Sequence, residues 1–351
     1  MIIQTNNVSH KIKVALVGVG HISKKHLNAI NTLNDKMELV AVCESNKEIL
    51  AQIELPKGTY LYSDFSEMIN NCDIDVVSLC TPSGLHPEQT IEAAKKKINV
   101  ITEKPMATTY PDAKKMINAC KKNNVKLFVV KQNRFNPAVQ LLKQSIAAQR
   151  FGNIILASLN VFWTRPQTYY DSADWRGTRR FDGGALMNQA SHYVDLLKWL
   201  IGPVDSIQSF MSRHRDIEVE DTGVINIHHI SGTLSSINYT MLTFPKNLEG
   251  SITILGEKGT VKISGNGLDR IDEWLFETKE DLDPDIEKMN QELPEFNKTS
   301  HVPYYQHVIN AIKGRVDNYI DGEQGLHSLE LMIAAEKSSK EQRIINLPLE
   351  K

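Results

Sequence analysis

The sequence predicts an α/β protein made of a doubly wound parallel (Rossmann) sheet, followed by an α+β domain with a mostly antiparallel open sheet. Two observations carry this prediction. Short apolar runs alternate with helical stretches as far as about residue 130, whereas strands joined by short turns dominate after residue 150. A chain of 351 residues is also too long for one small core. We therefore expect one domain over residues 1–130 and a second over residues 131–351.

The first domain contains alternating predicted strands and helices. The strands are Ile12–Val17, Leu39–Cys43, Asp75–Cys80, Asn99–Thr102 and Lys126–Val130. The helices are Ile22–Leu33, Asn46–Ile53, His86–Lys97 and Pro111–Asn123. Because the strand runs are continuously apolar, we expect a parallel sheet that helices cover on both faces.

The second domain has longer strands and fewer helices. The predicted strands are Ile154–Trp163, Val224–Ile230, Leu234–Thr243, Ser251–Leu255, Thr260–Ser264 and a last short Ile344–Leu349. The predicted helices are Asn136–Arg150, Tyr304–Lys313 and Gly325–Arg343. Side chains alternate along residues 234–241, so one strand face is apolar and the other modestly polar. The polar face is expected to meet solvent or a partner subunit.

Composition excludes several classes of protein. Lys and Arg total 40 against 42 Asp and Glu, and this net charge of −2 gives no reason to bind nucleic acid. No apolar run approaches the ~18 residues that a membrane-spanning helix needs, and the first residues lack a secretory signal. The four cysteines form no CxxC motif, which argues against a zinc cluster or disulfide framework, and reduced thiols fit the cytoplasm.

A glycine-containing turn follows the first predicted strand. Gly18 permits a tight turn, and Gly20 permits the backbone to approach a pyrophosphate at the N-terminus of the next helix. Ser23 replaces the third glycine of the dinucleotide fingerprint, which weakens the match. Glu44 ends the next strand, where a carboxylate accepts hydrogen bonds from ribose hydroxyls and repels a 2′-phosphate. The pattern predicts NAD in preference to NADP, with a plain β-turn-α connection as the alternative.

Two further loops leave the carboxyl ends of predicted strands, where such sheets bind ligands. One loop carries Thr81, Ser83 and His86, and the other carries Glu103 and Lys104. Each motif alone is more typical of an ordinary loop. Because they follow neighbouring strands beside a dinucleotide fingerprint, together they predict the nicotinamide end of the cofactor site.

The segment 181–203 is the most informative part of the chain. Glycines open it and Gly202-Pro203 closes it, which predicts a helix between them. Asn188, His192 and Asp195 form a polar stripe, rotated by about 200° from the apolar face of that helix. The apolar face is Leu186, Ala190, Tyr193, Leu197 and Leu200. The polar stripe is either a solvated surface or a catalytic face on which Asp195 orients the imidazole of His192.

Oxidation of a secondary alcohol by hydride transfer needs a group that takes the hydroxyl proton. A histidine with a pKa near about 6.5 can do so near neutrality, whereas a lysine needs a lowered pKa. We therefore assign His192 as the base, and Lys104 as the residue that positions the hydroxyl and stabilises negative charge on its oxygen. The opposite assignment stays open.

These residues together resemble the glucose–fructose oxidoreductase and inositol dehydrogenase family over nearly the whole chain. The matching pieces are Gly18 to Gly20, Thr81 to Ser83, Glu103 to Pro105 and the helix with His192 and Asp195. Members of that family oxidise or reduce sugar carbons with NAD(P), using the lysine and the histidine of these motifs. Many have an aspartate one turn before the histidine, where this chain has Asn188.

Segments 162–171, 185–192 and 243–256 are similar to one subgroup, the UDP-N-acetyl-glucosaminuronate 3-dehydrogenases. That resemblance implies oxidation of the sugar C3 hydroxyl of a UDP-sugar to a ketone. The product would lead to a diacetamido-uronic acid of surface polysaccharide such as lipopolysaccharide O-antigen. The resemblance also implies a homotetramer built through the open sheet and, in some members, re-oxidation of bound NADH by 2-oxoglutarate.

The expected contacts follow from these motifs, and no metal site is expected. The expected cofactor contacts are Gly18, Gly20, His21, Ile22, Glu44, Thr81, Ser83, His86, Glu103, Lys104, Gln132, Trp163 and Arg165. The expected substrate contacts are Lys104, Gln167, Tyr170, Asn188, Gln189 and His192. A uronate carboxylate favours a planar bidentate donor, and Arg165 is the first choice among the arginines near the catalytic helix. The alternative is that Arg165 and its neighbours Arg176, Arg179 and Arg180 are surface or subunit-contact residues.

Two other functions stay open at this stage. One is an inositol or simple-sugar dehydrogenase of the same family. The other is a non-catalytic NAD-binding regulator, which the presence of both Lys104 and His192 argues against. Fold alone does not decide between them.

Overall fold

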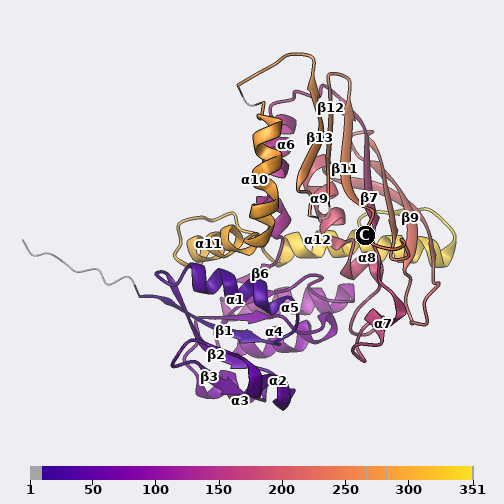
Figure 1. Cartoon of the computed structure of the whole chain (residues 1–351). Coiled ribbons are helices and arrows are strands. Elements are labelled where there is room, and N and C mark those ends of the chain that lie inside the picture. Colours follow the sequence, from indigo (N-terminus) through magenta and orange to yellow (C-terminus); the bar gives the residue numbers. More distant parts are fainter. Residues whose placement is uncertain (1–9, 266, 282, 350–351) are drawn as a thin grey trace, which may run out of the picture.

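The computed structural model describes residues 10–265, 267–281 and 283–349, which build two sheets with helices around them (Figure 1). The N-terminal sheet lies in the lower part of Figure 1, and the larger sheet stands at the upper right. None of the helices in these described residues is both long and apolar enough to cross a membrane.

The N-terminal sheet has six parallel strands in the order β3-β2-β1-β4-β5-β6. Its strands are β1 (Ile12–Val17), β2 (Met37–Cys43), β3 (Tyr60–Tyr62), β4 (Val76–Leu79), β5 (Asn99–Thr102) and β6 (Leu127–Val129). The strand order reverses between β1 and β4, and ligands bind at such a switch point in doubly wound sheets. The predicted parallel sheet is confirmed, although the sequence pattern missed the short, mostly exposed β3.

Helices pack around this sheet, and their ends follow local signals. They are α1 (Ser23–Thr32), α2 (Lys47–Gln52), α3 (Phe65–Asn71), α4 (His86–Lys95) and α5 (Tyr110–Asn123), with 3₁₀ turns η1 (Ser83–Leu85) and η2 (Gln132–Phe135). The side chain of Asn46 caps α2 and that of Thr109 caps α5. Asn124 ends α5 in the left-handed conformation with φ of 55°.

The second sheet has eight strands in the order β13-β12-β11-β7-β10-β9-β8-β14. The strands are β7 (Ile154–Phe162), β8 (Val204–Ser212), β9 (Thr222–His229), β10 (Leu234–Thr240), β11 (Glu249–Gly256), β12 (Gly259–Ser264), β13 (Arg270–Phe276) and β14 (Ile345–Asn346). Every pairing is antiparallel except that of β7 with β10, which is parallel. The mostly antiparallel sheet is therefore as predicted, while β8 and β13 were missed because buried and exposed residues do not alternate regularly along them.

Helices cover one face of this sheet and leave the other open (Figure 1). Those that contact the sheet are α6 (Pro137–Ala147), α8 (Ala185–Asn188), α9 (Ser191–Ile201), α10 (Ile286–Lys298) and α12 (Gly322–Glu341). The short α7 (Gln167–Tyr170) follows β7 in the chain, and α11 (His301–Ile312) packs against α1. On the open face, Ser236 donates to Ser158 and Asn238 donates to Asn160 across the β7–β10 pair. The polar strand face expected from the alternation of residues 234–241 is this open face.

The C-terminal helices connect the two sheets. Tyr304, Tyr305 and Val308 of α11 are fully buried in one apolar cluster with residues of β1 and β2. Helix α12 packs against both α5 and β8. Because α12 contacts β6 and α5 as well as α8, α9 and β8, it holds the edge of the parallel sheet against α8 and α9.

Candidate active site

The loop after β1 is shaped to accept a dinucleotide. Gly18 has a φ of +87°, and a Cβ there would lie 3.0 Å from the backbone carbonyl of Cys80, so only glycine fits. A Cβ at Gly20 would meet nothing within 4 Å, so the space beside this backbone is open to a ligand. The turn leads into the N-terminus of α1, whose free amides suit a pyrophosphate. The loop therefore fits NAD.

Glu44 lies against this turn. One carboxylate oxygen accepts a hydrogen bond from the Val19 amide at 2.7 Å, and the other accepts from the Asn46 amide at 2.9 Å. That is the place expected for a ribose-binding carboxylate. Ser23, which replaces the third glycine, is buried and donates its hydroxyl to the Gly20 carbonyl at 2.6 Å. The serine therefore stabilises the turn.

The remaining predicted residues of this region lie in two groups. His21 is exposed and Ile22 is half-buried, both at the start of α1. Thr81 and Ser83 are half-buried in the loop after β4, and Thr81 donates its hydroxyl to Gln89 at 2.6 Å. Because β1 and β4 are adjacent and parallel, this second loop lies beside the glycine turn.

His86 connects the loops after β4 and β5. Its Nε2 lies 2.9 Å from the Thr81 carbonyl oxygen and its Nδ1 lies 3.1 Å from the Pro105 carbonyl oxygen. The ring is completely buried, and burial lowers the pKa of His86. Both ring nitrogens are occupied by backbone oxygens, so the geometry favours a positioning role over direct cofactor contact.

Lys104 joins the parallel sheet to the catalytic segment. Its Nζ donates a hydrogen bond to the carbonyl oxygen of Asn188 at 2.6 Å. Burial lowers the pKa of Lys104, the charges of Glu103 and Asp182 oppose that shift, and the Arg165 guanidinium adds to it. A lysine with a lowered pKa can donate and accept protons more readily near neutrality.

His192 lies on the same side of the site. Its Nε2 lies 3.2 Å from the side-chain nitrogen of Gln132, the first residue of η2. Burial lowers the pKa of His192 well below its usual value, and the charge of Lys104 adds to that shift. The imidazole is therefore neutral near pH 7 and able to accept a proton.

The segment 181–203 contains two helices, where the sequence predicted one. Helix α8 ends at Asn188 and α9 starts at Ser191, so the chain bends between them. Gly184, with a φ of +108°, precedes α8, and a Cβ there would collide with the carboxylate of Glu220. The bend directs the Asn188 carbonyl to Lys104, a geometry that helical periodicity alone could not reveal.

The prediction that Asp195 orients His192 is wrong. The Asp195 carboxylate accepts hydrogen bonds from Arg134 at 2.8 and 2.7 Å and from the Ser328 hydroxyl at 2.8 Å, and Lys131 Nζ lies 3.4 Å away. These cationic groups occupy both oxygens, so no hydrogen bond joins Asp195 to His192 in the described chain. Burial opposes the charged form, but Lys131 and Arg134 outweigh it and lower the pKa of Asp195 below its usual range.

Sequence reasoning also did not reveal that Lys131 and Arg134 hold the carboxylate of Asp195 beside the site. Asp195 is 2% exposed, which excludes the alternative of a solvated surface for it. Lys131 lies two residues after the end of β6, at the same sheet edge as Thr81 and Lys104. That strand-end position is the signal that could have revealed it.

Two arginines, Arg165 and Arg176, flank the ring of Tyr169. The guanidinium carbon of Arg165 lies 5.3 Å from the centre of the Tyr169 ring, and that of Arg176 lies 4.2 Å from it. Arg165 also lies 5.4 Å from the ring centre of Trp163. Neither guanidinium forms an ion pair with a carboxylate in the described residues. Half-buried cations without a carboxylate partner favour an anionic ligand.

The residues predicted to contact the sugar lie around this arginine pair and differ in their hydrogen-bond partners. The side-chain amide of Gln167 forms hydrogen bonds with the Asp171 carboxylate and with the backbone of Asp216. These bonds connect α7 to the 213–218 loop.

Gln189 is 5% exposed and donates a hydrogen bond to the Tyr169 hydroxyl at 3.4 Å. Tyr170 is buried, and burial raises the pKa of its hydroxyl above the usual value. Asn188 donates its side-chain amide to Asp182. Asn188 is therefore the one of these residues whose carbonyl contacts Lys104, whereas the described partners of Gln189 and Gln167 lie elsewhere.

Several buried polar atoms of this region have no hydrogen-bond partner within the described residues. They are Gln132 Oε1, Trp163 Nε1, the Tyr170 hydroxyl and Arg176 Nε. Such atoms are rare in folded proteins, because each costs about 1–3 kcal/mol when left unpaired. Gln132 lies beside His192, so a polar ligand bound there would complete the hydrogen bonds of this amide.

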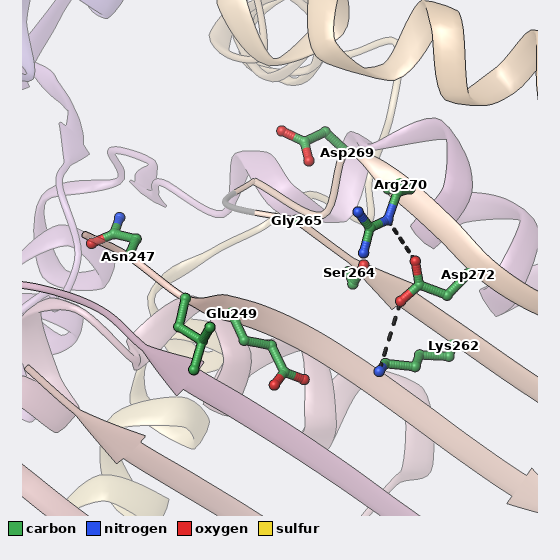
Figure 2. Close-up of a pocket in the computed structure, with 9 residues that line it drawn as sticks. Asn247, Glu249, Lys262, Ser264, Gly265, Asp269, Arg270 and Asp272 are labelled. Atoms are coloured by element: carbon green, nitrogen blue, oxygen red, sulfur yellow. Dashed lines mark hydrogen bonds and ion pairs between the residues drawn. The ribbon is translucent and has the colours of Figure 1, made fainter. Parts of the chain in front are cut away.

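A separate polar hollow of about 480 Å³ lies over β11, β12 and β13 (Figure 2). Its cations are already neutralised, because Arg270 and Lys262 lie 2.6 Å and 3.7 Å from the Asp272 carboxylate. None of the predicted site residues lines it. The hollow is therefore not part of the candidate active site.

Comparison with known families decides the identity of the fold and its chemistry. Residues 12–131 match the model of an oxidoreductase family described as an NAD-binding Rossmann fold, and residues 143–347 match its C-terminal alpha/beta domain. The chain belongs to this oxidoreductase family. NAD is accordingly its cofactor, and the resemblance inferred from the sequence motifs is confirmed.

Two solved structures are similar to this chain over nearly its whole length. The WlbA dehydrogenase from Bordetella pertussis, in complex with NADH and UDP-GlcNAcA, is 48% identical with a TM-score of 0.95, covering 98% of this chain and 99% of that one. The WlbA dehydrogenase from Chromobacterium violaceum, with the same two ligands, is 47% identical with a TM-score of 0.90 and covers 97% of both chains.

A curated relative of another specificity is more distant. The myo-inositol 2-dehydrogenase of Thermotoga maritima is 23% identical over 355 aligned positions, covering 96% of this chain and 98% of that enzyme.

Proposed function

We propose that this oxidoreductase uses NAD to oxidise the C3 hydroxyl of UDP-N-acetyl-glucosaminuronic acid to the 3-keto sugar. The observation that carries the proposal is the near full-length likeness to two dehydrogenases described with NADH and UDP-GlcNAcA, at 48% and 47% identity. The neutral His192 and the lysine Lys104 beside the cofactor loops are the groups that this chemistry requires.

The residues of the site divide the reaction between them. Bound NAD supplies the acceptor for the hydride that leaves the sugar carbon. His192 accepts the hydroxyl proton, because its lowered pKa keeps the imidazole neutral near pH 7. Lys104, held by the Asn188 carbonyl, donates a hydrogen bond to the same oxygen and stabilises its negative charge.

The cofactor is proposed to lie along the edge of the parallel sheet. Gly18, Gly20, His21 and Ile22 would hold the pyrophosphate, and Glu44 the adenosine ribose. Thr81, Ser83, Gln132 and Trp163 would surround the nicotinamide end. Glu103 and His86 support that end through the loops they connect.

The substrate is proposed to place its acidic groups on the arginine pair. Arg165 and Arg176 offer planar donors with no carboxylate partner, which suits the uronate carboxylate or the diphosphate. Arg165 therefore joins the substrate contacts in addition to its predicted place near the cofactor. Asn188, Gln189 and Tyr170 line the remaining sugar site, and Gln167 lies at its margin.

Assembly, location and pathway are part of the same proposal. Apolar side chains stand on the open face of the second sheet, where Phe210 is 65% exposed opposite the 44% exposed Val224. Such a face supports a homotetramer that packs through the open sheet. We place the enzyme in the cytoplasm, in a route to a diacetamido-uronic acid of O-antigen polysaccharide, with 2-oxoglutarate re-oxidising bound NADH.

The test is product formation by the purified protein with NAD and 2-oxoglutarate. Mass spectrometry should detect a product two mass units lighter from UDP-N-acetyl-glucosaminuronic acid, because two hydrogens leave. UDP-N-acetylglucosamine and myo-inositol are the controls. Turnover of myo-inositol in place of the uronate would favour the simple-sugar alternative. Binding of NAD without any product would favour the non-catalytic regulator.

A further inference from the structure

A buried cluster of three titratable side chains lies directly behind the catalytic lysine. We call His26, Glu103 and His301 the His26 cluster, and their residues are 0%, 5% and 3% exposed. They come from α1, from the loop after β5 and from the start of α11. None of them takes part in the reaction steps proposed above. Burial of titratable groups costs free energy, so their presence here needs a physical explanation.

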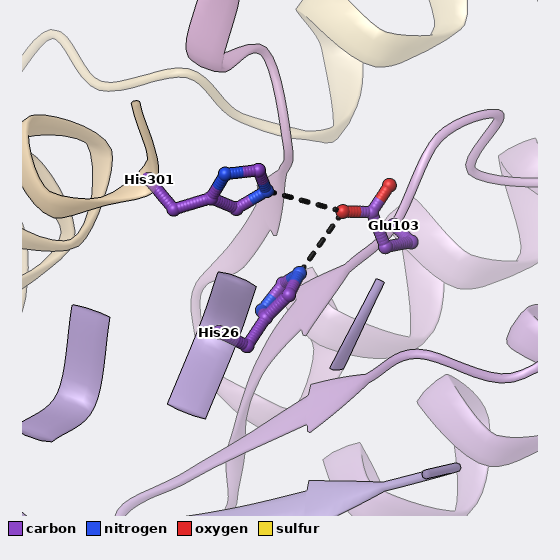
Figure 3. A group of neighbouring side chains, drawn as sticks. All are labelled: His26, Glu103 and His301. Atoms are coloured by element: carbon purple, nitrogen blue, oxygen red, sulfur yellow. Dashed lines mark hydrogen bonds and ion pairs between the residues drawn. The ribbon is translucent and has the colours of Figure 1, made fainter. Parts of the chain in front are cut away.

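Both imidazoles converge on one carboxylate oxygen (Figure 3). His26 Nε2 lies 3.0 Å from Glu103 Oε1, and His301 Nε2 lies 3.6 Å from the same oxygen. The second oxygen, Oε2, accepts a hydrogen bond from the backbone amide of Lys104 at 3.0 Å. The carboxylate therefore spans the gap between the two histidines and the catalytic residue.

The other ring nitrogen of His26, which faces away from Glu103, also has hydrogen-bond partners. His26 Nδ1 lies 2.8 Å from the Tyr305 hydroxyl and 2.9 Å from the Ser78 hydroxyl. These contacts determine the orientation of the His26 ring, and through it the orientation of the carboxylate. Helix α1 also begins just after the glycine turn, so the cluster links the cofactor loop to Lys104.

The charges in and around the cluster support one ionisation state. Burial opposes a charged His26, but Cys80, Tyr305 and Glu103 outweigh it and raise the pKa of His26 well above its usual value. Burial also opposes a charged Glu103, yet the two histidines lower its pKa well below the usual value. Burial lowers the pKa of His301. The titratable and charged groups that face the cluster are Cys80 of the β4 end, Lys25 of α1, Lys104, and Tyr304 and Tyr305 of α11.

We propose that His26 and His301 are positioning residues for Lys104, which act by holding an ionised Glu103 against the lysine's backbone amide. The ionised carboxylate fixes the Lys104 peptide and keeps a negative charge beside its ammonium group. That charge opposes the effect of burial on the pKa of Lys104. The proposal rests on Lys104 acting in catalysis as proposed above.

The first test measures Lys104 without any substrate. Competitive labelling of the NAD-bound enzyme with acetic anhydride over a range of pH, followed by peptide mass spectrometry, gives the titration midpoint of Lys104. Glu103→Gln removes the charge and keeps the shape, so the midpoint should fall by about one pH unit or more. An unchanged midpoint in a variant that still binds NAD would overturn the proposal.

The second test asks whether the histidines act through Glu103. His301→Phe keeps a buried ring but removes the ring nitrogen that lies 3.6 Å from the Glu103 carboxylate, and should lower kcat tenfold or more with little change in KM. His301→Gln, which places a polar N–H group on the same side of Glu103, should restore part of the loss. His307→Phe on the same helix is the matched control, because His307 accepts from the Ile320 amide and does not contact Glu103.

A double-mutant cycle completes the test. In the Glu103→Gln background, His301→Phe should cost little more, because the two residues then act as one unit. Independent, multiplying losses would contradict the proposal. Should the wild-type enzyme oxidise no UDP-sugar, the proposed function fails, while the labelling of Lys104 still decides the role of Glu103.

Discussion

Lys104 Nζ donates a hydrogen bond of 2.6 Å to the carbonyl oxygen of Asn188, which lies 84 residues further along the chain. The bond links the loop after β5 to the bend between α8 and α9. It therefore connects the edge of the cofactor sheet to the segment that carries His192. The proposed site depends on this junction, because neither half alone contains both Lys104 and His192.

Loss of either catalytic side chain should reduce turnover without unfolding the protein. We expect His192→Ala and Lys104→Ala each to lower kcat by ~10² or more, the usual scale for a lost acid–base group. NAD binding, measured by fluorescence titration, should survive His192→Ala, because the cofactor loops are on other segments. Full activity in both variants would disprove the catalytic assignment.

The pH dependence of kcat/KM should reflect the lowered pKa values of His192 and Lys104. A base with a lowered pKa stays neutral at lower pH, so the acidic limb of kcat/KM should lie below the usual histidine value of about 6.5. A protonated donor with a lowered pKa loses its proton earlier, so the basic limb should lie below about 10.4.

Lys104→Gln offers an internal check on these limbs. It removes a charge that lowers the pKa of His192, so the acidic limb of the residual activity should move upward. A downward move would contradict the assigned electrostatics.

Substitution of the two glycines of the cofactor turn by alanine should affect different properties, stability for one and NAD binding for the other. Gly18→Ala should destabilise the protein by about 2 kcal/mol or more, because its φ is +87° and the new Cβ meets the Cys80 carbonyl. Gly20→Ala should change stability by only about 0.5 kcal/mol, since that Cβ meets no protein atom. It should instead weaken NAD binding tenfold or more. Urea denaturation and calorimetric titration measure the two effects, and equal behaviour of the variants would refute this account of the turn.

The arginine pair should control affinity for the acidic substrate. Arg176→Met should raise KM for UDP-N-acetyl-glucosaminuronic acid by about tenfold or more, the scale of one charged hydrogen bond. Arg270→Met is the control, because Arg270 is paired with Asp272 in the separate hollow of Figure 2. Parallel titrations with UDP and UDP-N-acetylglucosamine show whether the pair binds the diphosphate or the carboxylate. Equal KM values in wild type and Arg176→Met would remove the arginine from the site.

Sequence reasoning identified the residues whose signals are local. Gly18, Gly20 and Glu44 lie at fixed places in a strand–turn–helix pattern, and the structure places them around one turn. The family and its cofactor also followed from such motifs. The alternating strands of the second sheet predicted its class, because side-chain alternation is a property of each strand alone.

What the sequence could not predict depends on contacts between distant segments. Asp195 lies one turn from His192, but Arg134 and Lys131 from another strand end hold its carboxylate. Helical periodicity gives the direction of a side chain and not the partner it meets. The parallel pairing of β7 with β10 and the convergence of His26 and His301 on Glu103 are long-range in the same way.

Isotope transfer from the sugar to the cofactor tests the central claim most directly. UDP-N-acetyl-glucosaminuronic acid carrying deuterium at C3 would be incubated with the enzyme and NAD, without 2-oxoglutarate. After denaturation of the protein, mass spectrometry would examine the released nicotinamide cofactor. The account predicts NADH one mass unit heavier than normal, with the deuterium lost from the sugar. Deuterium retained at C3 while NADH forms would contradict it, because the hydride would then come from another carbon.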